Sequence, residues 1–300
     1  MQRDDSWESL KVGAVAYAIQ GGRTLESFLN RVDEWFKKAR AEGVELLLFP
    51  ELFVADLLPS GAKVVSQREE VALWEQLARE QFAPLLEGFE RLSRHWSINT
   101  VFGSLPRWGD GAVLNSAPVV FQGRRPVLQD KLFITPCEDR IWKWQNGSIL
   151  HRISAPWGDG VVLICHDVEV PQISQLLVEE APEWILVPSC TGSQMGLNRV
   201  RWCSQARAVE HHAYVLQTST LGPGPATPNM NEHTGQAALI TPCDLAYEGM
   251  AKVGTLNQEE LLVGSLDFGL LRKMRKQSLV YPARDQRGRE VQPGVGRALG

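Results

Sequence analysis

The sequence lacks the features that would assign it to a membrane or secreted class. No window approaches the roughly 20 consecutive apolar residues that a membrane-spanning helix requires. The N-terminal stretch is acidic and polar before a short apolar run, so it has neither the basic n-region nor the apolar core of a signal peptide. These absences lead us to expect a cytoplasmic protein with no membrane partner.

Cysteine is scarce, and its pattern signals neither disulfides nor a metal. The five cysteines are odd in number, no CxxC pair occurs, and they lie at positions 137, 165, 190, 203 and 243. This pattern predicts no disulfide framework, no zinc site and a reducing compartment. The adjacent His211 and His212 are interpreted as packing or surface groups, since a metal site would need partners that the sequence does not reveal. We expect no cofactor.

The chain also lacks a large charge excess of either sign. It has 31 Lys and Arg against 35 Asp and Glu, for a formal net charge of −4. Such a balance gives no reason to expect nucleic acid as a partner. A hydrophobic content of 44% is ordinary for a globular protein, and 300 residues suit one layered α/β domain.

Short apolar runs alternate with longer amphipathic stretches. Strands that alternate with helices favour an α/β fold, and nearly continuous apolar runs are typical of strands covered on both faces. Strands are predicted at 12–19, 44–49, 100–105, 117–122, 161–165, 184–188, 214–218, 237–241 and 261–266. Helices are predicted at 25–40, 71–96, 173–180 and 195–212.

No low-complexity linker divides the chain, so we predict one domain over residues 1–283. Residues 284–300 are rich in Gly and Arg, and we interpret them as a tail that is mobile or lies at a subunit interface. The loop 221–234 has repeated Gly and Pro and is long enough to form the rim or lid of a site. A passive surface loop is the open alternative.

Three residues stand out at strand-end sites in separate parts of the chain. Glu51 ends FPE (49–51), Lys131 ends QDK (129–131), and Cys165 follows VVLI (161–164). In layered α/β proteins, reactive groups gather where strands end and loops begin. A thiol, a carboxylate and an ammonium group could there act as nucleophile, base and stabiliser of an anionic intermediate. From the residues alone this combination is only suggestive, since many chains contain such a set.

These segments resemble the signature blocks of the nitrilase, or carbon–nitrogen hydrolase, superfamily. The matching blocks are FPE at 49–51, DK at 130–131 and ICHD at 164–167, and their order and spacing carry the resemblance. The resemblance implies a single-domain, four-layer α-β-β-α sandwich with a Glu–Lys–Cys triad. It implies that Cys165 is the nucleophile and Glu51 the base. It also implies that Lys131 and the backbone N–H of His166 stabilise the tetrahedral intermediate.

Further residues near these blocks are candidate site residues. Glu138 matches a second glutamate that many amidase-type members carry near the lysine, although a structural ion pair with its charged neighbours is an alternative. Trp142 and Cys190 could line the pocket, with core packing as the alternative for both. The imidazole of His166 is not expected to act as the base, because adjacent side chains in an extended chain point to opposite sides.

The chain departs from the family pattern just after the cysteine. Amidase-type members usually read Cys-Tyr-Asp-x-Arg-Phe-Pro, whereas residues 165–171 read CHDVEVP, so Glu169 replaces the usual arginine. In carbamoylase-like members, arginines near that position recognise a substrate carboxylate. Glu169 at the pocket would therefore predict a substrate that is neutral or carries an amine. The alternative is that Glu169 faces away and pairs with a basic residue such as Arg199 or Arg201.

Together these features predict an amidase that hydrolyses a small linear amide through a cysteine thioester. A nitrilase that converts a nitrile to an acid and ammonia is the alternative, although Asp167 stands where nitrilases usually have Glu and so favours the amidase. A catalytically weak binding or assembly module is an alternative of another class, against which the intact triad argues. Because family members are usually dimers or larger, the resemblance also implies a homodimer or higher homo-oligomer.

Overall fold

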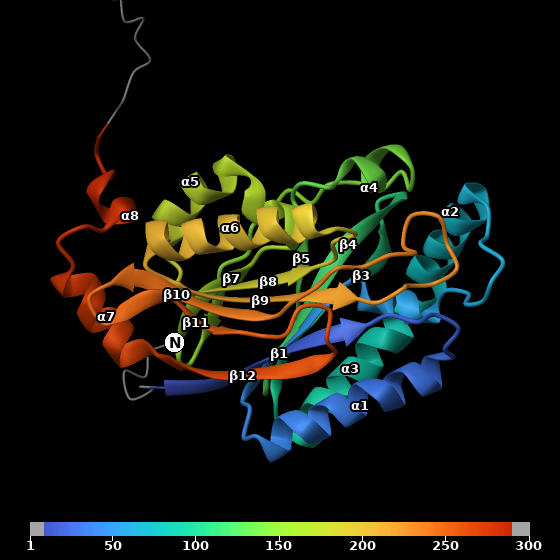
Figure 1. Ribbon diagram of the computed structural model, residues 1–300, viewed down its shortest axis with the longest axis horizontal. Coiled ribbons are helices and arrows are strands. Elements are labelled where there is room, and N and C mark those ends of the chain that lie inside the picture. The colour runs from blue at the N-terminus through green and yellow to red at the C-terminus, as the bar shows by residue number, and fades with distance from the viewer. Residues whose placement is uncertain (1–8, 290–300) are drawn as a thin grey trace, which may run out of the picture.

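The computed structural model describes residues 9–289, in which strands and helices alternate (Figure 1). The strands are β1 (Ser9–Ala18), β2 (Leu46–Glu51), β3 (Asn99–Gly109), β4 (Ala112–Val120), β5 (Val127–Asp130), β6 (Ile153–Ala155), β7 (Gly158–Val162), β8 (Trp184–Ser189), β9 (Tyr214–Leu221), β10 (Ala238–Asp244), β11 (Tyr247–Val253) and β12 (Glu260–Asp267). The helices are α1 (Leu25–Ala41), α2 (Gln67–Gln76), α3 (Phe82–Trp96), α4 (Pro136–Arg140), α5 (Pro171–Glu180), α6 (Gln194–His211), α7 (Phe268–Gln277) and α8 (Pro282–Asp285). Short 3-10 helices cover Phe53–Leu57 and Cys165–Glu169.

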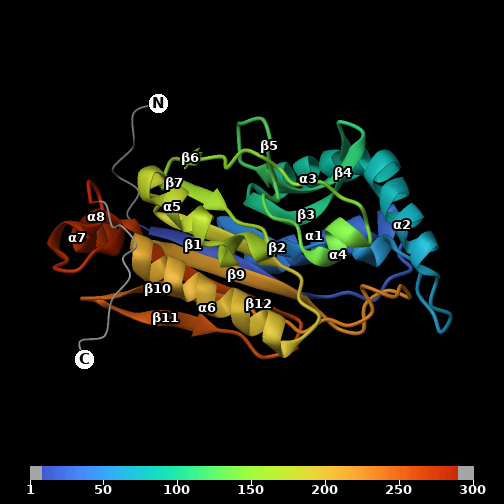
Figure 2. The same cartoon turned by 90° about the horizontal axis from the view of Figure 1, so that it is seen from above.

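The strands form two halves that pack face to face. One half has the order β12-β1-β2-β3-β4-β5, and the other has the order β6-β7-β8-β9-β10-β11. The halves are joined where Tyr17 and Ala18 of β1 pair with Thr220 and Leu221 of β9. Helices α1 and α3 cover the outer face of the first half, and α5 and α6 cover that of the second (Figures 1 and 2). The predicted α-β-β-α sandwich is confirmed.

Strand β1 shows why its sequence reads as a continuous apolar run. Val12, Ala14 and Ala16 belong to the core between the two halves. Val15 and Tyr17 belong to the core under α1 and α3. Since successive side chains of a strand point to opposite faces, a strand covered on both sides needs apolar residues at every position.

Stacked aromatic rings pack β2 and β3 against helix α3. Phe89 of α3 stacks on Phe102 of β3 with centroids 4.1 Å apart, and Phe102 stacks on Phe49 of β2 at 5.7 Å. Each buried phenyl ring contributes on the order of 2 kcal/mol through its removal from water. The C-terminal end of β2, at Glu51, is therefore held on a rigid part of the core.

Several predicted boundaries differ from the observed ones. The predicted helix 71–96 starts at Gln67 and is interrupted by a π-turn over Leu77–Gln81, which separates α2 from α3. The predicted strand 161–165 was wrong at its end, because β7 stops at Val162 and Cys165 opens a 3-10 helix. Strands β5, β6 and β11 and helices α4, α7 and α8 were not predicted. Strands β5 and β6 and helices α4 and α8 have at most five residues each, and β11 is mostly exposed. Helix α7 buries Phe268, Leu271 and Met274 at near-helical spacing, a signal that sequence reasoning missed.

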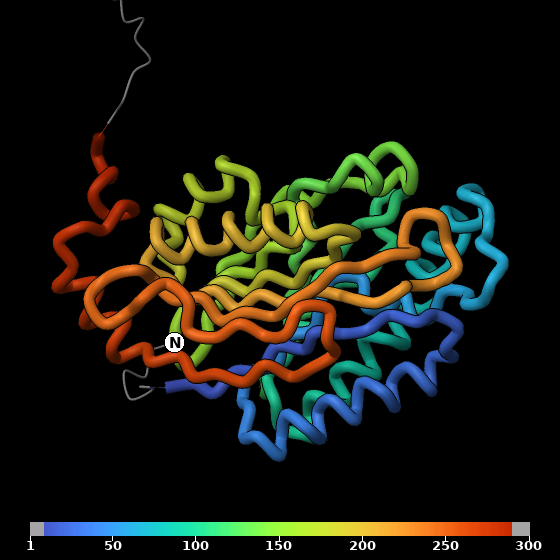
Figure 3. The backbone as a smooth tube through the Cα atoms, viewed as in Figure 1, coloured from blue at the N-terminus to red at the C-terminus, as the bar shows by residue number. Residues whose placement is uncertain are grey.

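The predicted C-terminal tail falls mostly outside the described residues, which end at 289. Residues 284 and 285 complete α8, and Arg287 donates to the carbonyl of Val178 at 2.8 Å. Within residues 9–289, no helix is long and apolar enough to cross a membrane. Helices α2 and α4 and the loop between β9 and β10 lie at one end of the molecule, and α7 and α8 lie at the other (Figures 1 and 3).

Gly103 lets β3 approach the end of β2 unusually closely. Its φ is +53°, and β3 carries a bulge between Val101 and Leu105. A Cβ at position 103 would lie 1.8 Å from the carbonyl oxygen of Pro50. Glu51 follows Pro50 and pairs with β3 immediately after this contact. The glycine therefore helps to position the carboxylate of Glu51.

We expect Gly103→Ala to lower the free energy of unfolding by about 3 kcal/mol, through left-handed strain and overpacking against the backbone. The matched control is Gly111→Ala, where φ is +83° and nothing lies within 4 Å of an added Cβ. It should lose only about 1 kcal/mol, the cost of the left-handed backbone. Urea denaturation of both variants measures the difference. Equal losses would show that the close approach to Pro50 does not constrain this strand.

Candidate functional site

The three residues of the predicted triad meet at one buried point. Glu51 ends β2, Lys131 directly follows β5, and Cys165 lies three residues after β7. The Nζ atom of Lys131 donates to Oε1 of Glu51 at 2.7 Å, and the Cys165 thiol lies close enough to both charges for each to act on its pKa. The three side chains are at most 5% exposed. A thiol, a carboxylate and an ammonium group are thus brought together from separate parts of the chain.

The backbone at Cys165 adopts an uncommon conformation. Its φ is +49°, in the left-handed region, although the residue is not glycine. Such a conformation costs on the order of 1–3 kcal/mol and persists only where the surroundings over-determine it. The Sγ atom contacts the carbonyl oxygen of Cys190 at 3.7 Å. The sharp turn after β7 therefore aims the thiol at the triad rather than along the strand.

Glu138 is the second carboxylate on Lys131. Its Oε2 accepts from Lys131 Nζ at 2.7 Å and from the Thr135 backbone N–H at 2.7 Å. Thr135 caps α4 and forms a capping box with Glu138, a T-x-x-E signal that the sequence displays. Glu138 therefore does not make the predicted alternative ion pair with its neighbours in sequence, but binds the lysine.

Asn115 on β4 connects the two carboxylates and was missed by sequence reasoning. Its Nδ2 donates to Glu51 Oε1 at 3.0 Å and to Glu138 Oε1 at 2.7 Å. Asn is depleted in strand interiors, so a buried Asn among apolar residues is the signal that could have found it. Asn115 fixes the spacing of the two glutamates independently of the lysine.

Asp167 ties the cysteine turn to the lysine segment. Its Oδ1 accepts from the backbone N–H groups of Leu132 and Phe133 at 3.0 and 2.8 Å, and its Oδ2 accepts from that of Ile164 at 3.1 Å. Asp167 is fully buried. It thereby bridges the residues that flank Lys131 and Cys165 in sequence, and acts as a positioning residue for both.

The two glutamates have different pKa shifts. Burial raises the pKa of Glu51 above its ordinary value, and the opposing effect of Lys131 is too weak to cancel it. Burial also acts on Glu138, but Lys131 and the Thr135 and Asn115 donors outweigh it, so the pKa of Glu138 is lowered. Two carboxylates whose pKa values are pushed apart are suited to different roles. Glu138 is the permanent anion, and Glu51 is the more basic group.

The thiol and the ammonium group are both protonated in the resting site. Burial, followed by the charge of Glu51, raises the pKa of the Cys165 thiol well above its ordinary value. Burial lowers the pKa of Lys131, but Glu138 and Glu51 outweigh it and raise that pKa well above the usual range. A neutral thiol beside a basic carboxylate needs proton transfer before it can attack.

A cavity of about 120 Å³ opens above the triad. Cys165 lies just behind its wall, in contact with Cys190. The loop 221–234 supplies four wall residues, which favours the rim interpretation over a passive loop. Trp142 also lies in the wall and packs on Trp74 and Trp144. The wall consists of Glu51, Leu52, Lys131, Thr135, Cys137, Glu138, Trp142, Cys190, Gly192, Asn229, Met230, Glu232 and His233.

Glu169 does not lie in this wall, which corrects the prediction that it sets the charge of the pocket. Its carboxylate pairs with Arg199 at 2.9 Å and with His166 Nδ1 at 3.5 Å. The geometry is thus the alternative in which Glu169 faces away and is neutralised by an arginine. The His166 ring points toward Glu169, so it is neither a base for Cys165 nor part of the wall. Residues Cys165–Glu169 form a 3-10 helix. The expectation that the chain is extended at His166 was therefore wrong.

The neighbouring histidines have structural contacts. His211 Nε2 lies 3.0 Å from the Ser174 hydroxyl, and His212 stacks on Tyr281 with centroids 4.3 Å apart. No group of three or more His, Cys, Asp or Glu side chains within residues 9–289 is arranged to hold a metal ion.

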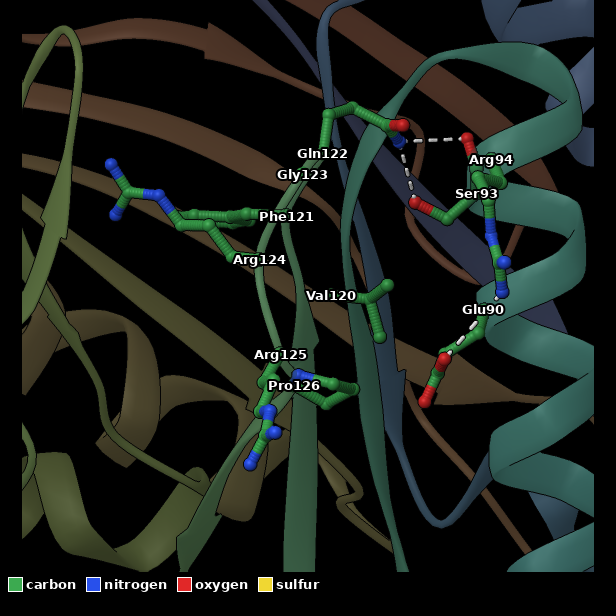
Figure 4. Close-up of a pocket in the computed structure, with 10 residues that line it drawn as sticks. All are labelled: Glu90, Ser93, Arg94, Val120, Phe121, Gln122, Gly123, Arg124, Arg125 and Pro126. Atoms are coloured by element: carbon green, nitrogen blue, oxygen red, sulfur yellow. Dashed lines mark hydrogen bonds and ion pairs between the residues drawn. The ribbon is translucent and has the colours of Figure 1, made fainter.

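A separate hollow of about 350 Å³ lies between α3 and the turn that connects β4 to β5 (Figure 4). Its polar groups bind one another: Gln122 donates to Ser93 at 3.0 Å, and Arg94 pairs with Glu90 at 3.6 Å. This hollow shares no residue with the triad cavity, and its wall contains no cysteine. The smaller cavity at the triad is therefore the candidate active site.

Comparison with known proteins agrees with the site geometry. The family described as carbon-nitrogen hydrolase matches residues 11–276. A probable hydrolase, YhcX of Bacillus subtilis (strain 168), is 27% identical over 280 residues, which cover 93% of this chain and 54% of that protein. This chain thus spans about half the length of that relative.

Two solved structures share the fold. Nit3 of Saccharomyces cerevisiae, a member of branch 10 of the nitrilase superfamily, is 17% identical with a TM-score of 0.74, covering 91% of this chain and 95% of that chain. A Glu-to-Gln mutant of the amidase from Nesterenkonia sp. AN1 shows covalent addition of the acetamide moiety of fluoroacetamide at the active-site cysteine. It is 18% identical with a TM-score of 0.70, covering 91% of this chain and 96% of that chain. Since the family match extends over nearly the whole described chain, this protein belongs to the carbon–nitrogen hydrolase family.

Proposed function

We propose that this protein is an amidase that hydrolyses a small linear amide through a thioester at Cys165. The observation that carries the proposal is that the Cys165 thiol is buried beside the ion pair of Glu51 with Lys131. Covalent addition at the active-site cysteine of the Nesterenkonia amidase supports the same role for Cys165. A cavity of about 120 Å³ suits a short substrate, because one water occupies roughly 30 Å³.

In the acylation step, Glu51 accepts the thiol proton as Sγ forms a bond to the amide carbon. The carbonyl oxygen becomes an anion, which the Lys131 ammonium group and the backbone N–H of His166 stabilise. Glu51 then gives the proton to the nitrogen, the C–N bond breaks, and ammonia or an amine leaves. The acyl group remains on Cys165 as a thioester.

In the deacylation step, Glu51 removes a proton from water, and the oxygen attacks the thioester carbon. The C–S bond breaks, the acid leaves, and Sγ recovers the proton from Glu51. Glu138 and Asn115 take no proton in either step. They hold Lys131 and Glu51 at fixed spacing, so little reorganisation is needed as charge develops.

Cys165→Ala is expected to reduce ammonia release from a panel of small amides by ~10³-fold or more, because the thioester cannot form. Cys243→Ala is the control, since Cys243 is exposed and lies outside the cavity. Mass spectrometry of the wild type should find the acyl group on Cys165. Ammonia from matched nitriles but not from amides would identify a nitrilase instead. If no acyl adduct forms and Cys165→Ala loses no activity, both the amidase and the nitrilase are contradicted. A binding or assembly module would then be the remaining alternative.

The pH dependence of kcat/KM should have an acid limb above the ordinary glutamate pKa of about 4.3, because Glu51 must be ionised and burial raises its pKa. No fall in kcat/KM is expected up to about pH 9, since burial and nearby charges raise the pKa values of the Cys165 thiol and Lys131 above their ordinary values.

Glu138→Gln removes a negative charge next to Glu51 and so should move the acid limb of the pH profile to lower pH. Asp139→Asn, an exposed charge change one residue away, should leave it in place. A limb unmoved by Glu138→Gln would exclude Glu51 as the titrating base.

We also propose a cytoplasmic homo-oligomer. All five cysteines are free, which fits a reducing compartment. Helix α6 carries exposed apolar side chains at Met195, Trp202 and Val209, which are 72%, 64% and 37% exposed. Their seven-residue spacing forms one stripe, and the same stripe on a second copy would complement it.

Trp202→Glu is expected to shift sedimentation toward the monomer, because it places a charge in the apolar stripe of α6. Ile149→Glu is the matched control, since Ile149 is 61% exposed but lies away from α6. Dissociation by the control alone, or an unchanged assembly in both variants, would exclude α6 as the interface.

A further inference from the structure

The cavity above the triad carries more negative than positive side chains. Its wall contains three carboxylates, Glu51, Glu138 and Glu232, and one cation, Lys131. The ammonium group of Lys131 already binds two of these carboxylates. Glu232 is exposed at the mouth, so its charge has no counterpart in the wall.

A further carboxylate lies directly behind the wall. Glu70 of α2 is fully buried, and its Oε2 accepts from the neutral amide of Asn229 at 2.6 Å. Its Oε1 has no hydrogen-bond partner within the part of the chain that the structure describes. Asn229 and Cys137 are wall residues, and burial, followed by the charge of Glu70, raises the pKa of the Cys137 thiol to about 12. Burial raises the pKa of Glu70 itself, so Glu70 adds negative charge behind the cavity wall only where the pH exceeds that raised value.

A narrow site lined by one sign of charge focuses the field and concentrates ligands of the opposite sign. A substrate carboxylate in this cavity would meet Glu232 at the mouth and Glu70 through a wall of low polarisability, where charges are weakly screened. A protonated amine would be attracted by the carboxylates of Glu232 and Glu70. An uncharged acyl chain would not interact electrostatically with either carboxylate.

We propose that the cavity selects amides that carry a second, cationic amino group, with Glu232 at the mouth as its main counter-charge. This inference rests on the proposed amidase function. It differs from the expectation drawn from Glu169, because Glu169 is outside the cavity and is paired with Arg199. The residues that determine specificity are Glu232 and, through Asn229, Glu70.

The test uses three amides of equal length: 5-aminopentanamide, pentanamide and 5-amino-5-oxopentanoate. The cationic amide should have the highest kcat/KM and the anionic amide the lowest. Glu232→Gln should lower the ratio of kcat/KM for the cationic amide to kcat/KM for pentanamide about five-fold, the equivalent of an exposed ion pair of ~1 kcal/mol. The preference should also weaken at high ionic strength.

Glu87→Gln is the matched control, because it makes the same charge change on the exposed face of α3, away from the cavity. Glu70→Gln should lower the same ratio, of kcat/KM for the cationic amide to kcat/KM for pentanamide. If pentanamide is hydrolysed but the anionic amide is hydrolysed equally well, the inference fails while the amidase stands. If Glu232→Gln and Glu87→Gln change the three amides alike, the inference fails too. If no amide of any charge is hydrolysed, the amidase fails and the inference with it.

Discussion

The buried ammonium group of Lys131, held between Glu51 and Glu138, is the interaction on which the rest of the site depends. Each of these charges would cost several kcal/mol to bury alone, so burial is tolerated only because all three are paired and hydrogen-bonded. The pairing needs strand ends from β2 and β5 and the first turn of α4 to converge. The same pairing helps to separate the pKa values of the glutamates, so that the pKa is raised for Glu51 and lowered for Glu138.

The spacing around this ion cluster comes from residues outside the predicted triad. Asn115 bridges the glutamates, and Asp167 bridges the backbones beside Lys131 and Cys165. Gly103 allows the close backbone contact that directs the end of β2. A positive φ at Cys165 is held by this rigid frame, which is how strain is commonly retained at functional sites.

Charge in the cavity illustrates how a local sequence pattern can point to the wrong residue. Glu169 follows the cysteine closely, and an acid there suggested a charge beside the substrate. In the folded chain Arg199 of α6 neutralises it, while Glu232 and Glu70 come from segments with no motif. The charge of the cavity is therefore a property of the assembled wall and not of the segment around Cys165.

The sequence by itself was enough to predict the layered fold and the family, and to single out Glu51, Lys131, Glu138 and Cys165, which the structure places close together. The spacing of apolar residues and the order of the motifs are properties of the amino-acid sequence, so they can be recognised without the folded structure. Only the tertiary structure decided the orientation of Glu169 and His166, the bridging by Asn115 and Asp167, and the composition of the cavity wall. Those features depend on contacts between residues far apart in the chain, where backbone conformation and charge pairing are set by packing and leave no period in the sequence.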